Sequence, residues 1–462
     1  MIKKDPIVIF TTLAMNQTEY FLAIAAELQK QKNQIVFISF HDRSDVLIKK
    51  HGYLVYNVHD YSSAIEHPRN ISSHFHEKYE VNLNNFISHE KYFFNECDSK
   101  RLVDKTTRYF SAVENIFEII ESGNSGNISI IQELGGFIAL RATYHVSMRK
   151  KYTHYFMEPS FISGRMFMQM NTLSSFNKVP DQGLKASAEI REMLSDVIKH
   201  DKIVVPQKDK WKHQSVIKIL TSPARIIRLA QKVSDKYIFN KKEELDYISV
   251  YVFQHVRMLI NKYRLQRHYQ IPGEKYIYFP LHVPADMVLT VRSPEYLDQY
   301  ALLDYVARII PYGYGLVIKE HPVLVGGIDY SRVSALLNRH DNICLCDPNT
   351  NNFKLVESAS LVLTINSKAG MEAWIKHKPV IVLGDAFYST APGISNIDRL
   401  TDLGDAIIES LQTKYSVDQE DIEGYLQLIW NNTIEGEIWE MNQNKIKSTA
   451  KELNSLINTI NT

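Results

Sequence analysis

"LVLTINSKAGMEAWIKHKPVIVLG", residues 361–384, holds the pattern that decides the fold. Apolar runs at 361–366 and 379–384 are short enough for strands, and the helix-forming segment 368–377 lies between them. Strands this apolar are buried on both faces, which is typical of a parallel sheet with right-handed crossover connections. The stretch therefore predicts a strand–helix–strand unit of an α/β domain.

The same alternation continues upstream of this stretch. The turn residues Pro272-Gly273 precede a series of short apolar segments separated by helical ones. We expect further strands at 275–281, 316–320 and 342–347, which gives a doubly wound, Rossmann-like domain over residues 271–395.

An equivalent pattern opens the chain. Strands are expected at 7–13, 35–40, 53–58, 128–134 and 154–161, with helices between them and polar, irregular loops and helices over 60–110. Asp5 and Pro6 interrupt the start of the first apolar run, which favours a strand over a signal peptide. Residues 1–165 are thus predicted to form a second Rossmann-like domain.

The chain between the two domains has a different character. Strand patterns fade over 166–270, so we expect a helical insertion there, and residues 396–462 are expected to be mostly helical. Residues 199–267 hold 16 Lys and Arg against 6 Asp and Glu, although the whole chain has a net charge of +1. These basic helices either present solvated faces or attract an anionic glycan, a lipid-linked acceptor or the inner membrane surface.

Composition excludes several classes of protein. The chain has 462 residues, 45% of them hydrophobic, and no run approaches the ~20 apolar residues that span a bilayer. Its three cysteines are too few for a disulfide framework and indicate a reducing compartment, which we take to be the cytoplasm. No motif that recognises nucleic acid is present.

Polar residues end one of the predicted strands of the second domain. Lys319 and His321 alternate onto one face of the extended chain, with Glu320 on the other, and Pro322 keeps His321 extended. A cation and an imidazole at a strand end suit a phosphate, because ligands of open α/β sheets bind at the carboxyl ends of the strands. A solvated strand end is the alternative.

A second group follows strand 361–366. Asn366 or Ser367 is the expected N-cap of a helix whose first N–H groups attract anions, and Lys368 adds a positive charge. Gly370 permits a close approach, and Glu372 can accept a hydrogen bond from a ribose or sugar hydroxyl. Ordinary helix capping explains the same residues.

The first domain has candidates for acid–base chemistry and for binding an acceptor. Glu133 ends a strand before Gly135-Gly136 and can deprotonate an acceptor hydroxyl, with Glu158 as the second candidate. Arg141 and Arg165 can each bind a substrate carboxylate through two hydrogen bonds. Surface and structural roles remain open for all four.

The sequence predicts neither a metal ion nor a cofactor. It contains no Asp-x-Asp motif, and "HFHEKYE" (74–80) is expected to be a polar loop rather than a metal site. Lys319, His321 and the helix N-terminus are expected to offset the charge of a leaving group instead.

Three segments carry a resemblance to a known family. "YFPLHVPADMVL" (278–289), "LVIKEHP" (316–322) and "LTINSKAGMEAWIKHKPVIVLGDAFY" (363–388) resemble the capsule polysaccharide biosynthesis family, which includes bacterial β-Kdo glycosyltransferases. The His-Pro and Ser-x-x-Gly-x-Glu-Ala elements are similar to those of bacterial sialyltransferases and polysialyltransferases. The resemblance covers residues 275–392, and the N-terminal half only in outline.

This resemblance implies a GT-B fold, in which two Rossmann-like domains face a cleft, and a CMP-activated ulosonic acid such as Kdo as donor. It implies that His321 and Ser367 contact the nucleotide phosphate, Glu372 the ribose, and that Pro322 shapes the cytidine pocket. Lys368 departs from the family, which has a small or hydroxyl residue there.

The expected function is transfer of Kdo or a related sugar to a glycan or lipid-linked acceptor during capsule or lipopolysaccharide synthesis, at the inner membrane. Glu133 as base predicts inversion at the anomeric carbon, whereas the β-Kdo enzymes imply retention. A UDP- or GDP-sugar transferase, a UDP-sugar 2-epimerase and a non-catalytic glycan-binding protein are the alternatives.

Overall fold

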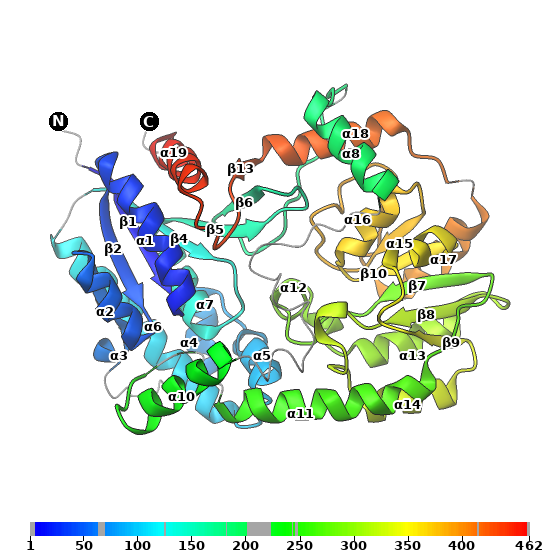
Figure 1. Ribbon diagram of the computed structural model, residues 1–462, viewed down its shortest axis with the longest axis horizontal. Coiled ribbons are helices and arrows are strands. Elements are labelled where there is room, and N and C mark those ends of the chain that lie inside the picture. Colours follow the sequence, from blue (N-terminus) through cyan, green and yellow to red (C-terminus); the bar gives the residue numbers. More distant parts are fainter. Residues whose placement is uncertain are drawn as a thin grey trace. The chain divides into compact units, whose positions relative to one another are not determined.

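The chain forms two compact units, each built on its own sheet. The computed structural model describes residues 5–62, 70–123, 126–181, 183–200, 223–242, 244, 248–413 and 415–459. Unit 1 combines Met1–Leu173, Val205–Val250 and Asn432–Thr462, and unit 2 combines Ser174–Val204 and Tyr251–Asn431. Figure 1 labels the helices and strands of both units.

The sheet of unit 1 has the strand order β13-β6-β5-β4-β1-β2-β3. Five strands run parallel: β1 (Ile7–Thr12), β2 (Gln34–Ser39), β3 (Leu54–Asn57), β4 (Ile128–Glu133) and β5 (Thr153–Pro159). Strand β6 (Arg165–Met170) runs antiparallel to both of its neighbours, β5 and the edge strand β13 (Thr433–Glu435). All six residues of β1 are buried, as expected for a central strand with a core on each face.

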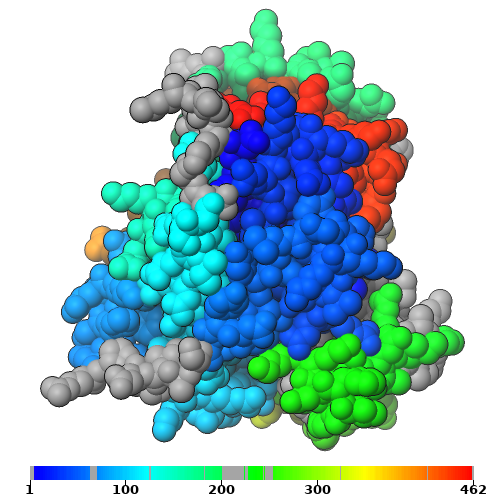
Figure 2. All heavy atoms as spheres, turned by 90° about the vertical axis from the view of Figure 1, so that its left-hand side faces the viewer, coloured from blue at the N-terminus to red at the C-terminus, as the bar shows by residue number. Residues whose placement is uncertain are grey.

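Helices cover both faces of this sheet. On one face α1 (Met15–Lys30) packs beside α19 (Gln443–Thr459). On the other lie α3 (Val58–Tyr61), α4 (Ile71–Tyr79), α5 (Leu83–Phe94), α6 (Ser99–Gly123) and α7 (Ile138–Arg149). In Figure 2 the green α10 (Pro223–Tyr237) lies beside the blue α2 (Asp42–Lys50), where Arg43 and Asp235 form an ion pair.

The sheet of unit 2 has the order β12-β11-β10-β7-β8-β9, and all its pairs are parallel. Its strands are β7 (Tyr276–Pro280), β8 (Gly315–Lys319), β9 (Ile343–Cys346), β10 (Leu361–Thr364), β11 (Val380–Val382) and β12 (Ser395–Asn396). Its main helices are α13 (Gln299–Ile309), α14 (Tyr330–Arg339), α15 (Asn352–Ser358), α16 (Lys368–Ile375), α17 (Leu403–Gln412) and α18 (Gln419–Asn431).

The predicted α/β class with two Rossmann-like units is confirmed, and the predicted strands lie where the structure has them. Two local expectations were wrong. Residues 165–170 form the strand β6 although 166–270 was expected to be helical, and 74–79 lies in helix α4, which buries Phe75 and Tyr79, instead of a polar loop. Polar residues interrupt the apolar pattern of both elements, because β6 contains Arg165 and Gln169 and α4 is partly exposed.

The units group the chain differently from the four predicted segments. Of the expected C-terminal helices, those up to Asn431 lie in unit 2, whereas α19 lies in unit 1. The expected basic insertion contributes α8 (Ala188–His200), which contacts α18, as well as α10 and α11 (Ile248–Leu265). Residues 201–222 of that insertion lie outside the described residues. No helix in the described ranges is long and apolar enough to cross a membrane.

Helix α11 packs on the loop that follows β8. Asn261 Nδ2 donates to the carbonyl oxygens of Gly326 and Ile328, at 3.3 and 3.1 Å. Gly326 has a φ of +83°, and a Cβ there would lie 2.2 Å from the carbonyl oxygen of Met258. This contact between two backbones requires glycine at position 326.

We expect Gly326→Ala to lower the free energy of unfolding by about 2–4 kcal/mol, because the left-handed conformation and the backbone clash both oppose a Cβ. The control is Gly313→Ala, since Gly313 has a φ of +91° but nothing within 4 Å of the added Cβ. That control should lose only about 1–2 kcal/mol. Urea unfolding followed by fluorescence measures both, and equal losses would show that α11 does not press on Gly326.

Candidate functional site

The two polar strand ends singled out in the sequence lie at the same edge of the unit 2 sheet. β8 and β10 flank β7 on either side, and all three run parallel. Lys319 is the last residue of β8, and β10 ends just before Asn366, Ser367 and helix α16. The chain changes direction of winding at β7, and such switch points are where open α/β sheets bind ligands.

Lys319 is a nearly buried cation, with 4% of its surface exposed. Its Nζ donates to the carbonyl oxygen of Thr350 at 2.9 Å, in the loop after β9. Burial lowers the pKa of Lys319, and the neighbouring Cys346 and Glu372 act in the opposite direction. The site thus holds a positive charge that water barely screens.

Glu372 is a nearly buried carboxyl group in the second turn of α16. Burial raises its pKa to about 7, and contact with Asn352 and the charges of Lys368 and Lys319 oppose that shift. Asn352 Nδ2 donates to Glu372 Oε2 at 2.5 Å, and Tyr278 Oη donates to Asn352 Oδ1 at 2.7 Å. This chain of hydrogen bonds fixes the orientation of the Asn352 amide and therefore of the carboxyl group.

Ser367 is the N-cap of α16. Its hydroxyl accepts a hydrogen bond from the Ala369 amide at 3.2 Å, and its own amide donates to Thr364 Oγ1 at 3.0 Å. As an acceptor in its capping bond, the hydroxyl still has a hydrogen that it can donate. A Cβ on Gly370 would lie 2.2 Å from Tyr388 Oη, so this glycine makes room for a side chain of unit 2.

Asn366 joins the end of β10 to the short helix α12 (Met287–Thr290). Its Nδ2 donates to the Val288 carbonyl at 2.8 Å and to Ser293 Oγ at 3.0 Å. Its backbone amide donates to Nε2 of His282 at 3.4 Å. Burial lowers the pKa of His282 to about 4, which keeps this imidazole neutral. Asn366 therefore has a structural role in the site, whatever else it contacts.

His321 and Pro322 are exposed beyond the end of β8, where Pro322 begins a short 3₁₀ helix (Pro322–Leu324). Glu320 is buried instead, and its Oε1 accepts from the Gly326 amide at 2.9 Å. Burial raises the pKa of Glu320 to about 7. The loop is thus held from inside by Glu320, and it presents His321 to solvent.

In unit 1, Glu133 occupies the equivalent position of its own sheet. It ends β4 beside the end of β1, and β1 is the strand at which this sheet changes its direction of winding. Only 8% of Glu133 is exposed, and its Oε2 accepts from Gln17 Nε2 at 3.2 Å. Gln17 Oε1 accepts from the Leu13 amide at 2.7 Å, so the first turn of α1 holds the carboxylate in place.

The loop that follows Glu133 is closely packed. A Cβ on Gly136 would lie 2.3 Å from Nδ1 of His89, so the glycine lets the loop pass this buried imidazole. At the start of α7, the Ile138 amide donates to Glu90 Oε1 at 2.8 Å. Glu90 therefore caps the helix that begins directly after the loop.

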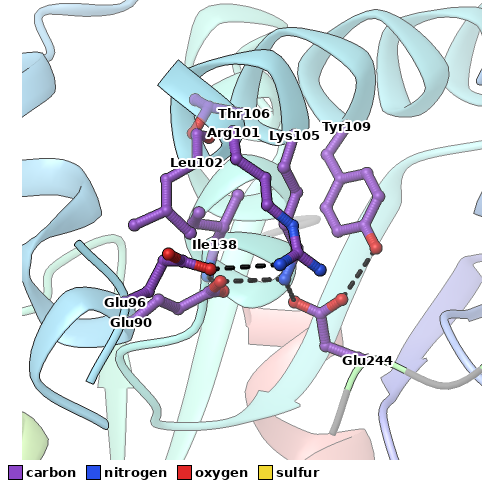
Figure 3. A network of polar contacts seen from close by, with 9 residues as sticks. All are labelled: Glu90, Glu96, Arg101, Leu102, Lys105, Thr106, Tyr109, Ile138 and Glu244. Carbon is purple, nitrogen blue, oxygen red and sulfur yellow. Dashed lines mark hydrogen bonds and ion pairs between the residues drawn. The ribbon is translucent and has the colours of Figure 1, made fainter. Parts of the chain in front are cut away.

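Figure 3 shows the charge cluster around Glu90. Lys105 Nζ lies 2.8 Å from Glu90 Oε2 and 2.7 Å from Glu244 Oε1, and Tyr109 Oη donates to Glu244 at 2.7 Å. Burial raises the pKa of Glu90, and its pairing with Lys105 opposes the shift. Lys105 thus neutralises part of the charge of two buried carboxylates. It also joins Glu244 to helices α5 and α6.

The remaining candidates of unit 1 lie apart from this arrangement. Glu158 is half-buried on β5, opposite Phe167. Arg141 is buried with its guanidinium 4.3 Å from the centre of the Phe86 ring, and its pKa is lowered to about 10 by burial. Arg165 Nε donates to Thr433 Oγ1 at 2.8 Å and joins β6 to β13. These contacts favour the structural alternative for both arginines.

The sequence analysis missed three residues of the unit 2 site: Tyr278, His282 and Asn352. His282 stands in the "PLHVP" segment, which carried part of the family resemblance, whereas nothing in the sequence pairs Tyr278 with Asn352. Within the described ranges no group of three or more His, Cys, Asp or Glu side chains could hold a metal ion.

Comparison with known proteins finds a family model that matches the region of this site. The family model described as "Capsule polysaccharide biosynthesis protein" matches residues 192–407, which include β7 to β11 and α16. The predicted resemblance to the capsule polysaccharide biosynthesis family is confirmed.

A curated relative matches a shorter part of the chain. Protein FixF of Sinorhizobium fredii is 34% identical over 120 residues, which are 26% of this chain and 28% of FixF. The matched stretch thus spans less than a third of that relative.

Solved structures with similar folds include both transferases and epimerases. KpsC of Thermosulfurimonas dismutans, a β-Kdo 2,7 transferase, is 18% identical, with a TM-score of 0.34 over 75% of this chain and 89% of its own. The UDP-GlcNAc 2-epimerase of Methanocaldococcus jannaschii is 12% identical, with a TM-score of 0.26 over 92% of this chain and 99% of its own. A similarity of this degree leaves the reaction open.

The buried carboxyl group of Glu372 predicts a pH-dependent stability. The pKa of Glu372 is raised to about 7, so below the unfolded-state value of about 4.5 both states are protonated and burial costs little. As pH rises from that value through 7, the free energy of unfolding of the wild type should fall by on the order of 3 kcal/mol relative to that of Glu372→Gln, which does not titrate. Urea unfolding of both proteins at several pH values measures the difference, and a constant difference would contradict the buried, protonated carboxyl.

Proposed function

We propose that this protein is a glycosyltransferase of capsule or lipopolysaccharide synthesis that transfers Kdo or a related ulosonic acid from its CMP-activated form. One observation carries the proposal. Lys319, Glu372 and the N-terminus of α16 come together at the switch point of the unit 2 sheet, within the region that matches the capsule family.

The nucleotide is proposed to bind at this edge. The first amides of α16 together with Lys319 and Lys368 supply positive charge to a phosphate, and Ser367 supplies a hydroxyl donor. His321, exposed beyond β8, is proposed to reach the same phosphate and to offset the charge of the leaving group.

Glu372 is proposed to recognise the ribose. The hydrogen bonds from Tyr278 through Asn352 leave its carboxyl group in one orientation, which suits recognition of a hydroxyl pair by a fixed acceptor. Pro322 is proposed to shape the cytidine pocket. The choice of a CMP donor rests on the resemblance of the His-Pro and Ser-x-x-Gly-x-Glu-Ala elements.

The acceptor is proposed to be a glycan or a lipid-linked saccharide at the inner membrane surface. Glu133 is proposed to act as the base, because it is a carboxylate held by Gln17 at the ligand-binding edge of its own sheet. The reaction is proposed to need no metal ion, since protein charges at the strand ends can stabilise the departing nucleotide.

A thermal-shift panel with CMP, UDP and GDP tests the nucleotide. CMP at 100 times its Kd should stabilise the protein by about 2.7 kcal/mol. Lys319→Met and His321→Ala should reduce the shift, whereas Lys275→Met, an exposed lysine of unit 2, should not. Stabilisation by UDP but not CMP would favour a UDP-sugar transferase or 2-epimerase, and no response to any nucleotide would favour a non-catalytic glycan-binding protein.

Glu133→Gln tests the base. We expect release of CMP from CMP-Kdo, in the presence of a membrane glycolipid extract, to fall by about 10²- to 10⁴-fold while the CMP-induced thermal shift remains. Glu158→Gln is the matched control on the neighbouring strand. Unchanged turnover in Glu133→Gln would remove this role, and a loss confined to Glu158→Gln would transfer it to Glu158.

A further inference from the structure

One face of helix α11 packs on unit 2. Met258, Asn261 and Leu265 are buried, and they face the loop after β8 and the core of unit 2. Their spacing of three and four residues defines a single inward stripe. An ordinary surface helix has polar residues opposite such a stripe.

The opposite face of α11 is apolar and exposed. Phe253, Val256, Ile260 and Tyr263 follow one another at intervals of three or four residues, with 74, 48, 47 and 80% of their surfaces exposed. Single exposed apolar side chains are common, but a continuous row of large ones marks an interaction surface. We call these four residues the outer stripe.

A hollow of about 700 Å³ adjoins the outer stripe. It is lined by Leu259, Ile260, Tyr263, Arg264, Arg267 and Tyr330. The guanidinium groups of Arg264 and Arg267 lie 5.5 and 5.4 Å from the centre of the Tyr330 ring, on α14. In Figure 1 this end of α11 lies beside α14. The hollow therefore combines an apolar floor with two cations.

The segment that carries the outer stripe has charges of one sign. Between Tyr247 and Glu274 the chain contains no acidic residue, and its four basic residues Arg257, Lys262, Arg264 and Arg267 are exposed. A second copy of this face would bring like charges together, which opposes association. The occupant that satisfies both features is apolar inside and anionic at its surface.

We propose that the outer face of α11 docks on an anionic lipid bilayer. The outer stripe enters the boundary between headgroups and acyl chains, and Arg264 and Arg267 bind lipid phosphates at its rim. The proposal deepens the proposed function by naming the surface that brings the enzyme to a lipid-linked acceptor. Membrane binding itself depends on neither the donor nor the base.

Co-sedimentation of the full chain with vesicles tests the proposal. Binding to mixed phosphatidylcholine and phosphatidylserine vesicles should exceed binding to phosphatidylcholine alone, and added salt should weaken it. Phe253→Ser combined with Tyr263→Ser, and Arg264→Gln combined with Arg267→Gln, should each reduce binding about tenfold or more. Tyr312→Ser and Arg399→Gln are the matched controls, because both side chains are exposed elsewhere in unit 2.

Two results would overturn the proposal: vesicle binding that both double variants retain, or a wild-type dimer that the stripe variant converts to a monomer without any vesicle binding. Light scattering after size exclusion detects the second result. The thermal midpoint without nucleotide checks that the variants are folded. Vesicle binding without a CMP-induced thermal shift would refute the proposed nucleotide site but not the proposed membrane-binding surface.

Discussion

The site in unit 2 depends on keeping one positive and one titratable group out of water at the end of a parallel sheet. Lys319 and Glu372 are almost fully buried and come from different strand–helix connections. Each makes the burial of the other less costly, and neighbouring polar groups complete their hydrogen bonds. The position of Thr350, Asn352 and Tyr278 follows from this requirement. A ligand that enters meets groups that are already oriented and little screened by solvent.

Unit 1 also keeps charged groups out of water, but it does so with a cluster of one lysine and two glutamates. Lys105 lies between Glu90 and Glu244, and Glu90 in turn caps the helix that follows the Glu133 loop. The cluster therefore stabilises the helix that follows the Glu133 loop. The ion pair with Lys105 also joins Glu244 to α6.

Much of the fold was predictable because buried parallel strands are apolar along their whole length, as β1 and β10 show. Strand β6 was not, since a strand with polar Arg165 and Gln169 lacks that signature. The positions of Lys319, Ser367 and Glu133 at strand ends were predictable, because the end of a buried strand is visible in sequence. The hydrogen bond between Tyr278 and Asn352 joins residues 74 positions apart, and no local pattern reports such a pair. The contact of Arg141 with the Phe86 carbonyl was not predictable, because a guanidinium that binds backbone carbonyls looks the same in sequence as one that binds a substrate.

The return of the chain to unit 1 has a consequence for biosynthesis. Helix α19 covers the apolar face of α1, yet the ribosome makes it only after all of unit 2. Residues such as Phe21, Ile24 and Leu28 therefore lack part of their cover while several hundred residues are still being translated. Unit 2 has most of its core in one continuous stretch, whereas unit 1 needs segments from both sides of it. The apolar face of α1 therefore stays partly uncovered until α19 is made.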